Sequence, residues 1–409
     1  MAQSTSVVSQ NEMNSDRPAE LSAPVYLDGF ATMPLASEAR AAMLAAWELP
    51  GNAGSPNASG ERAARIIADA RSEVASLIGA APAEIIFTSG ATEANNLAII
   101  GVATAARSQT ARRKIIVSAV EHKAILEPAA YLGTQGFEIL IAPVDKSGRL
   151  NLEAFEALID ENVLLTSVML VNNETGVIQP VAEAAAIAHR FGVFMHSDAA
   201  QAAGKIQINV SDLDVDYLSL SGHKCYGPMG VGALYVAAGM PPPFPLMRGG
   251  GQQGGVRPGT EPVQLIAGFG AACAVAAKAV AQSNAAETNS LIDRLLDALR
   301  KQDVRYSRIT GHHLVVPGSA AISLDGVDAD SLCALVAPDV SLSTGSACNS
   351  GQLKMSHVLE AMGFSEKSAR SVVRILCDRA STDADIDRAA EAIARSVRRS
   401  HLATGEVRQ

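Results

Sequence analysis

The sequence predicts an α/β fold with a mostly parallel central sheet, helices on both faces of that sheet, and a smaller α+β domain after it. First, short apolar segments alternate with segments of helical spacing, as in β-α-β units. Second, 48% of the residues are hydrophobic but only 4% are aromatic, so small aliphatic side chains can fill a large core. Third, the 409 residues correspond to about two or three domains of ordinary size.

The expected strands are short apolar runs, which indicates burial on both faces of a parallel sheet. They lie at residues 84–87, 114–117, 137–140, 164–168, 193–196 and 217–220. Helical spacing between them is clearest over residues 92–101 and 181–191. After the sheet, a long helical region is expected from residue 262 to about 301.

The composition along the chain predicts three parts. Residues 1–23 are polar and aperiodic, which predicts a disordered tail. Residues 24–262 are expected to form the larger α/β domain, and residues 263–409 the smaller α+β domain. The Gly/Pro-rich segment 241–259 breaks the strand–helix alternation, so it is a linker or a functional loop.

Charge and cysteine usage exclude several classes of protein. The net charge is -9 and the one basic run, 112–114, is short, so we expect no nucleic-acid partner. Five widely spaced cysteines favour reduced thiols over a disulfide framework or a metal site, which predicts a cytoplasmic protein without metal. The first residues do not resemble a secretory signal, and no apolar run reaches the roughly 20 residues of a membrane span.

A lysine follows directly on a predicted buried strand, in the turn Ser221-Gly222-His223-Lys224. Ligands in open α/β sheets bind at the carboxyl ends of the strands. Burial lowers the pKa of a lysine, and the uncharged amine can form a Schiff base with an aldehyde. An ordinary loop lysine is the alternative interpretation of this motif alone.

Asp198 ends the preceding predicted strand, and Gln201 follows three residues later. Pyridoxal 5′-phosphate needs a carboxylate that keeps its pyridine nitrogen protonated, and Asp198 is placed for that role. Gln201 can donate a hydrogen bond to the phenolic oxygen of the same ring. For Asp198 a helix N-cap is the alternative, although its position at the end of an apolar strand favours the cofactor.

The segment 88–96 predicts a phosphate-binding turn. A strand, then Ser-Gly-Ala-Thr, then a helix leaves free N–H groups around Ala91 and Thr92, at the positive end of the helix dipole. Ser221 and His223 can add donors to the same phosphate. Thr92 can alternatively serve only as a helix cap.

His122 follows another predicted strand, in the sequence Glu-His-Lys-Ala. Its ring can stack on the exposed face of the cofactor and can also transfer protons. A structural histidine is the alternative.

In their order and spacing these motifs resemble the fold-type I pyridoxal-phosphate enzymes, and among them the class V aminotransferase group. Further motifs at 171–180, 221–228, 249–260 and 343–348 are similar to those of the cysteine desulfurases of the iron–sulfur assembly type. The resemblance runs from about residue 25 to residue 387, which is nearly the whole chain.

The resemblance implies a role for each motif residue. Lys224 would carry the cofactor, Asp198 and Gln201 would bind its ring, and His122 would stack on it. The phosphate would be held by Ala91, Thr92, Ser221 and His223, and by Thr260 of the second subunit of a homodimer. Asn173 would contact the cofactor and, together with Arg374, the substrate carboxylate. A guanidinium fork suits a carboxylate, and an unpaired charge in the apolar run 372–375 would be costly.

Cys348 lies in a run of small and polar residues, 346–351, which can carry a thiol into a site or out to an acceptor. The resemblance implies that its thiolate attacks the sulfur of L-cysteine, keeps it as a persulfide and leaves L-alanine. The sulfur would then pass to an acceptor protein such as an iron–sulfur scaffold. The other four cysteines lie mostly in apolar runs and are expected to be buried and inert.

The sequence departs from the pattern of that family around the expected substrate site and in the 249–260 segment that would reach the second subunit, but not at the cofactor residues. The departures are at Gly29, Phe30 and Met33, in the 51–60 loop, at 253–254 and at 376–379. They leave other substrates open, so a selenocysteine lyase, a cyst(e)ine lyase or a transaminase are alternatives. A non-catalytic binding scaffold is a further alternative, because a fold does not fix a function.

Overall fold

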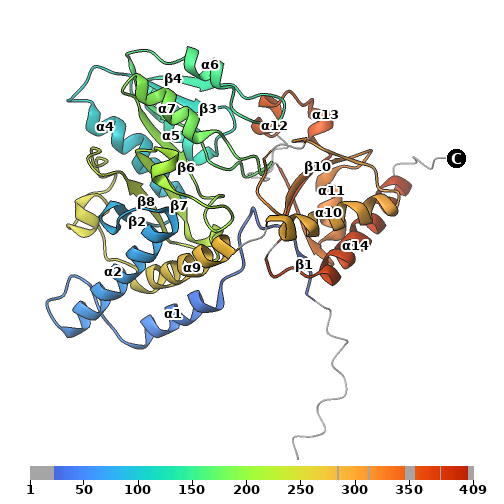
Figure 1. The fold of residues 1–409 in the computed structure, drawn as a ribbon, viewed down its shortest axis with the longest axis horizontal. Coiled ribbons are helices and arrows are strands. Elements are labelled where there is room, and N and C mark those ends of the chain that lie inside the picture. The colour runs from blue at the N-terminus through green and yellow to red at the C-terminus, as the bar shows by residue number, and fades with distance from the viewer. Residues whose placement is uncertain (1–22, 283–284, 312–313, 346–354, 378, 404–409) are drawn as a thin grey trace, which may run out of the picture.

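The computed structural model describes residues 23–282, 285–311, 314–345, 355–377 and 379–403. Within these residues the larger domain holds a seven-stranded sheet of order β2-β8-β7-β6-β5-β3-β4 (Figure 1). The strands are β2 (Ile85–Thr88), β3 (Lys114–Ser118), β4 (Glu138–Ala142), β5 (Val163–Ser167), β6 (Phe194–Asp198), β7 (Tyr217–Ser221) and β8 (Gly232–Val236). Only β8 runs antiparallel to its neighbours. The predicted, mostly parallel α/β sheet is confirmed.

All six predicted strands are present, and all except the edge strand β4 are mostly buried. β5 and β7 are buried at every position. The sequence analysis did not predict β8, which follows the lysine turn and a Gly-Pro-Met-Gly segment. Its first two residues, Gly232 and Ala233, have low strand propensity, and pairing with β2 and β7 places it in the sheet.

Helices cover both faces of this sheet, as predicted (Figure 1). One face is covered by helices that share the large core: α1 (Ser37–Glu48), α2 (Ala58–Ile78), α6 (Leu152–Ala157), α7 (Val181–Arg190) and α9 (Val263–Gln282). The other is covered by α3 (Ala91–Asn96), the π-helical turn η2 (Leu97–Gly101), α4 (Val102–Ala106) and α5 (Lys123–Thr134). The short helix α8 (Val210–Leu213) precedes β7.

The smaller domain has a four-stranded antiparallel sheet of order β12-β13-β10-β9. Its strands are β9 (Tyr306–Arg308), β10 (Ser319–Leu324), β12 (Ser343–Thr344) and β13 (Val372–Leu376). Its helices are α10 (Ala285–Lys301), α11 (Ala329–Val336), α12 (His357–Ala361), α13 (Glu366–Ala369) and α14 (Asp383–Ala403). A separate parallel pair joins β1 (Val25–Tyr26) to β11 (Val340–Ser341).

The hydrophobic cores divide the chain differently from the predicted boundary at residue 263. α9 packs against α1 and α2, and its Ile266 and Phe269 belong to the core of the larger domain. Val25 and Leu27 instead belong to the core of the smaller domain, although they lie near the start of the chain. The change of domain therefore falls after α9. The predicted tail, apart from residue 23, lies outside the described residues.

One helix in the described ranges, α9, is long and apolar enough by composition to cross a membrane. Its contacts with α1 and α2 give it the place of a core helix in this fold.

Candidate active site

Lys224 stands at the end of a short 3-10 turn (Gly222–Lys224) that begins directly after β7. Its Nζ donates hydrogen bonds to the main-chain carbonyls of Phe30, at 2.5 Å, and Ala31, at 2.7 Å. Burial lowers the pKa of Lys224 to about 8, and the positive charge of Arg374 adds to this shift. The amine is therefore partly uncharged near neutral pH, as attack on an aldehyde requires.

The turn that carries Lys224 is tied to the N-terminal segment through His223. The His223 carbonyl accepts a hydrogen bond from the Met33 N–H at 2.9 Å, and its Nδ1 lies 3.1 Å from the Thr32 hydroxyl. Burial lowers the pKa of His223 to about 4, helped by the charges of Lys224 and Lys205. The ring is therefore neutral at pH 7 and can offer one N–H donor, as its predicted phosphate role requires.

Asp198 ends β6, and the hydrogen bonds to its carboxylate within the described part of the chain come from neutral donors. Asn95 Nδ2 donates to Oδ2 at 2.7 Å, and the Ala200 N–H donates to Oδ1 at 2.9 Å. The bond to Ala200 is the local turn contact of the alternative interpretation, so the two roles coexist. Since no cation neutralises the carboxylate in these contacts, its charge is available to hold a proton on a neighbouring ring nitrogen.

Asn95 is a residue that the sequence analysis missed. It is fully buried in α3, 103 residues before Asp198, and its Oδ1 has no partner among the described atoms. No local signal in the sequence indicated it, because Thr92, Glu93 and Asn96 of the same short helix are also polar and only the fold shows that Asn95 is buried.

Gln201 and Lys224 donate hydrogen bonds to the same main-chain carbonyl, that of Phe30. Gln201 donates from Nε2 at 2.8 Å. Its Oε1 is buried and has no partner in the described part of the chain. The fold thus brings the predicted ring ligand next to the predicted Schiff-base lysine.

The predicted phosphate turn forms where β2 leads into α3 through Gly90. Gly90 has φ +151°, which favours glycine, and the N–H groups of Ala91 and Thr92 open the first helical turn, where intrahelical acceptors are missing. β8 passes close by: a Cβ on Gly232 would lie 2.6 Å from the Gly90 Cα. Ser221, at the end of β7, is buried beside this region.

An ion pair joins the glycine-rich segment to this turn. Arg257 Nε lies 3.0 Å from the Glu93 carboxylate, which also accepts from the Ser89 N–H. Thr260, three residues further on, is exposed, so its side chain is accessible to another subunit.

His122 caps α5, because its Nδ1 accepts a hydrogen bond from the Ala124 N–H at 3.1 Å. Its ring is exposed beside the site, and partial loss of solvent lowers its pKa, with Asp198 opposing the shift and Lys224 adding to it. The alternative, structural role of His122 is thus observed, as a helix cap. The stacking role stays a prediction. The cap does not prevent it, because the capping hydrogen bond uses only Nδ1 of the ring.

Arg374 brings the smaller domain into the site. It lies on β13, is 7% exposed, and donates from Nη1 to the Asn173 carbonyl at 3.2 Å. Its Nη2 lies 3.5 Å from Asp28 Oδ1, while its Nε is buried with no partner among the described atoms. A donor left over on a buried guanidinium fits the binding of a substrate carboxylate.

Asp28 is a second residue that the sequence analysis missed. Its Oδ2 accepts a hydrogen bond from Ser343 Oγ at 2.5 Å, so it links the first segment of the chain to β12. Its negative charge also opposes the downward shift in the pKa of Lys224. The contact with Arg374 spans most of the chain, so no local pattern could have indicated it.

The departures at Phe30 and Met33 face the core. Both side chains are buried, at 1% and 4% exposure, within the main core of the larger domain. What this segment presents to Lys224 is its main-chain carbonyls. The core thus accommodates the larger side chains, and their effect on the choice of substrate stays a prediction.

Cys348 lies outside the described residues, but the residues that border its segment are placed. Ser356 Oγ donates to the buried Glu174 carboxylate at 2.5 Å, and a Cβ on Gly345 would come within 2.8 Å of the same carboxylate. Burial raises the pKa of Glu174 to about 7. The described cysteines Cys225, Cys273 and Cys377 are buried, as expected, whereas Cys333 is only half-buried.

These groups fit pyridoxal phosphate as a set. The chain offers an amine that loses its proton near neutral pH, a carboxylate held by neutral donors, and a glycine turn at a helix start. The buried Gln201 Oε1 and Arg374 Nε are further polar atoms that a ligand can satisfy.

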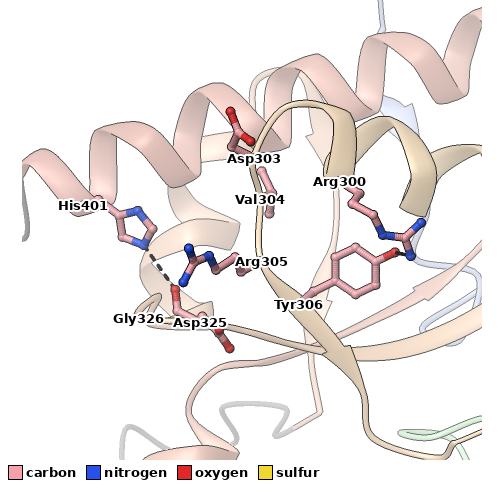
Figure 2. Close-up of a pocket in the computed structure, with 8 residues that line it drawn as sticks. All are labelled: Arg300, Asp303, Val304, Arg305, Tyr306, Asp325, Gly326 and His401. Atoms are coloured by element: carbon pink, nitrogen blue, oxygen red, sulfur yellow. Dashed lines mark hydrogen bonds between the residues drawn. The ribbon is translucent and has the colours of Figure 1, made fainter. Parts of the chain in front are cut away.

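A separate hollow of about 790 Å³ lies on the smaller domain, between the end of α10, β9 and the end of α14 (Figure 2). Two contacts link groups that line it: Arg300 donates to the Tyr306 hydroxyl at 2.8 Å, and His401 Nε2 donates to the Asp325 carbonyl at 3.2 Å. None of the predicted site residues lines it, so it is distinct from the candidate active site.

Comparison with known proteins identifies the family of this chain. Residues 25–389 match the model of the family "Aminotransferase class-V". The cysteine desulfurase of Homo sapiens is 42% identical over 388 residues, covering 92% of this chain and 82% of the relative. A solved "NIFS-like protein" has a TM-score of 0.85 and 33% identity over 92% of this chain and 99% of its own. The structure "SspA in complex with cysteine" has a TM-score of 0.75 and 34% identity over 86% of this chain and 98% of its own. The chain belongs to the class V aminotransferase family, and within it to the cysteine desulfurases.

Proposed function

We propose that this chain is a pyridoxal-phosphate-dependent cysteine desulfurase, which converts L-cysteine to L-alanine and holds the sulfur as a persulfide on Cys348. The observation that carries the proposal is the meeting of Lys224 and Arg374. They come from different domains, yet the charge of Arg374 helps to lower the pKa of Lys224. A reactive amine thus lies within electrostatic reach of a guanidinium with an unused donor, as an amino-acid substrate requires.

The residues divide the work of binding and proton transfer. Arg374 and Asn173 orient the carboxylate of L-cysteine, and Lys224 takes the proton from its Cα and later returns one. Asp198 holds a proton at the ring nitrogen. Pyridoxal phosphate, when bound, supplies an electron-withdrawing ring that stabilises the negative charge at Cα.

The sulfur step balances without an outside oxidant. The Cys348 thiolate forms an S–S bond to the substrate sulfur as the bond from that sulfur to the substrate Cβ breaks, leaving the electron pair on carbon. Protonation completes L-alanine, so that one thiol and one L-cysteine give one persulfide and one L-alanine. The persulfide sulfur then passes to an acceptor protein, for which an iron–sulfur scaffold is our proposal.

A homodimer is part of the same proposal. Three large apolar side chains in or just after α1 are exposed by more than half, Leu44 and Trp47 at 57% and Leu49 at 56%. A run of such side chains is typical of a surface that another subunit covers. Thr260 is also exposed, as a residue that reaches a partner's phosphate must be. We further propose a cytoplasmic location, in keeping with reduced thiols.

The direct test uses the purified holoenzyme and ³⁵S-labelled L-cysteine. The wild type is expected to carry label that a reducing thiol releases, and Cys348→Ser to keep its cofactor but carry no such label. Cys333→Ser, which changes a half-buried cysteine elsewhere, is the matched control and is expected to label normally. Unchanged labelling of Cys348→Ser would refute the assignment of the sulfur carrier. A keto acid in place of L-alanine would favour the transaminase alternative.

A further inference from the structure

A second amine, that of Lys205, lies directly behind Lys224. Its Nζ donates a hydrogen bond to the main-chain carbonyl of Lys224 at 2.9 Å. Lys205 belongs to the turn that follows β6, the same turn that carries Gln201, and Asp198 is the last residue of β6 before it. One short segment therefore holds both predicted ring-binding side chains and an amine that contacts the lysine turn.

The two turns pack closely because a glycine precedes Lys205. Gly204 has φ +74°, and a Cβ there would come within 2.9 Å of Cys225 Sγ and 3.2 Å of the Ala276 Cβ. Any larger residue would push the turn away from Cys225, which directly follows Lys224 in the chain. The contact between Lys205 and the Lys224 carbonyl thus depends on a close approach that glycine permits.

In the described part of the chain, Lys205 has no carboxylate counter-ion. Burial and the charge of Lys224 together lower its pKa to about 7, and the Cys225 thiol opposes the shift. The amine is therefore largely uncharged near pH 8, where Lys224 titrates, and it still donates its hydrogen bond to the Lys224 carbonyl. Arg379 of the smaller domain lines, with Lys205, a cavity of about 80 Å³. The hydrogen bond is thus the contact by which Lys205 acts on the lysine turn.

We infer that Lys205 is a positioning residue for Lys224: its amine holds the carbonyl of the lysine turn and so fixes the place of the Lys224 side-chain nitrogen. The inference rests on the proposed function, since it assigns Lys205 to the same site. The hydrogen bond needs a donor at this position, whereas the packing of the side chain needs only its length. Substitution by methionine removes the donor and keeps most of the packing, so the two contributions can be separated.

The test uses the reconstituted holoenzymes of Lys205→Met, Lys205→Arg and, as matched control, Lys278→Met at an exposed lysine of α9. The rate at which the visible band forms during reconstitution with pyridoxal phosphate is measured, as are kcat and KM for alanine formation. For Lys205→Met we expect band formation to slow by about tenfold, since the Lys224 amine is misplaced relative to the aldehyde. We also expect kcat to fall by roughly 10- to 100-fold with little change in KM, since the reacting nitrogen is misplaced.

Lys205→Arg keeps a donor, so its band formation and kcat are expected to lie closer to those of the wild type than to those of Lys205→Met, and Lys278→Met is expected to change neither rate. Wild-type rates in Lys205→Met would overturn the inference. A Lys205→Arg variant as slow as Lys205→Met would also overturn it, because a purely structural defect is not rescued by another donor. If Lys205→Met does not retain cofactor, the rates of Lys205→Arg decide in the same way. Band formation needs no L-cysteine, so that result stands even if the proposed substrate fails.

Discussion

Two main-chain carbonyls, rather than a carboxylate, receive the amine of Lys224. Carbonyls accept hydrogen bonds but bring no full negative charge to balance the ammonium. Burial and Arg374 can therefore lower the pKa of Lys224 to about 8 against the partial opposition of Asp28 and Asp198. The reactivity of this residue follows from its surroundings and not from its place in the sequence.

The first prediction concerns uptake of the cofactor by the apoenzyme. The rate at which pyridoxal phosphate produces the visible band should rise with pH to a midpoint at about 8, because only the uncharged Lys224 amine attacks the aldehyde. Lys224→Ala should give no band at any pH. Stopped-flow absorbance measures both, and a midpoint above pH 10, as for a solvated lysine, would contradict this account.

Glu121 gives a prediction about stability. It is fully buried, its Oε1 accepts from Ser118 Oγ at 2.9 Å and the Met169 N–H at 2.6 Å, and burial raises its pKa to about 8. Since the folded pKa lies above the unfolded value, its contribution is complete below about pH 4.5 and is lost as pH rises towards 8. Glutamine does not ionise, so Glu121→Gln should gain stability relative to the wild type over this interval.

Thermal unfolding from pH 5 to pH 8.5 measures the effect. The difference in Tm between Glu121→Gln and the wild type should grow in favour of the variant as pH rises. Glu360→Gln, at an exposed position of α12, should show a difference that does not depend on pH. A constant difference for Glu121→Gln would mean that the buried carboxyl does not take up a proton in this range.

At the scale of elements, the site is built where strands end. Asp198 closes β6 and Ser221 closes β7, so the ring partner and the lysine turn meet at one edge of the sheet. β8 returns antiparallel beside β7 and passes so close to Gly90 that it supports the start of α3. The phosphate turn thus depends on a strand that contributes no predicted ligand.

Gly232→Ala tests this dependence. An added Cβ would lie 2.4 Å from the Leu220 carbonyl oxygen and 2.6 Å from the Gly90 Cα, so the strand or the phosphate turn must move. We expect a loss of roughly 1–3 kcal/mol in stability, as for other overpacked sites, and weaker binding of pyridoxal phosphate. Gly133→Ala, in α5, is the control: its Cβ would meet only Ile139 at 3.6 Å, and it should gain up to about 1 kcal/mol. Equal cofactor affinity in both variants would contradict this role of β8.

Much of the site could be predicted because its residues lie at the ends of apolar runs. Lys224, Asp198 and Gln201 each follow a strand that the hydrophobic pattern marks, and the glycine before α3 marks the phosphate turn. Asn95 and Asp28 could not be found in this way. Their partners are 103 and more than 300 residues away, so their roles exist only in the folded chain. β8 was not predicted for a related reason: its first residues, a glycine and an alanine, have low strand propensity, and its pairing with β2 and β7 places it in the sheet.

At the scale of the whole molecule, the site requires both domains and the segment that begins the fold. Arg374 belongs to the smaller domain and Lys224 to the larger, while Asp28 contacts the first and acts electrostatically on the second. β1 pairs with β11 of the smaller domain, and residues 30–33 then contact the lysine turn. The relative placement of the domains therefore sets the distance between the reactive amine and the carboxylate-binding group.

The proposed dimer is tested by a charge in its apolar surface. Trp47→Glu should give a monomer and weaken cofactor binding, because a partner's Thr260 would be lost from the phosphate site. Leu402→Glu alters an apolar residue that is 67% exposed on α14 and should leave the dimer intact. Light scattering after size-exclusion chromatography measures the mass. A monomeric wild type, or a dimeric Trp47→Glu with normal cofactor affinity, would place the interface elsewhere or remove it.

Release of sulfur from L-cysteine is tested most directly by the yield of L-alanine and sulfide from purified holoenzyme, with and without a reducing thiol. We expect equal amounts of both products, stimulated by the thiol, because the thiol discharges the persulfide for another turnover. If the visible band of the bound cofactor is present but L-cysteine yields no L-alanine, the cofactor assignment stands and the proposed reaction is wrong.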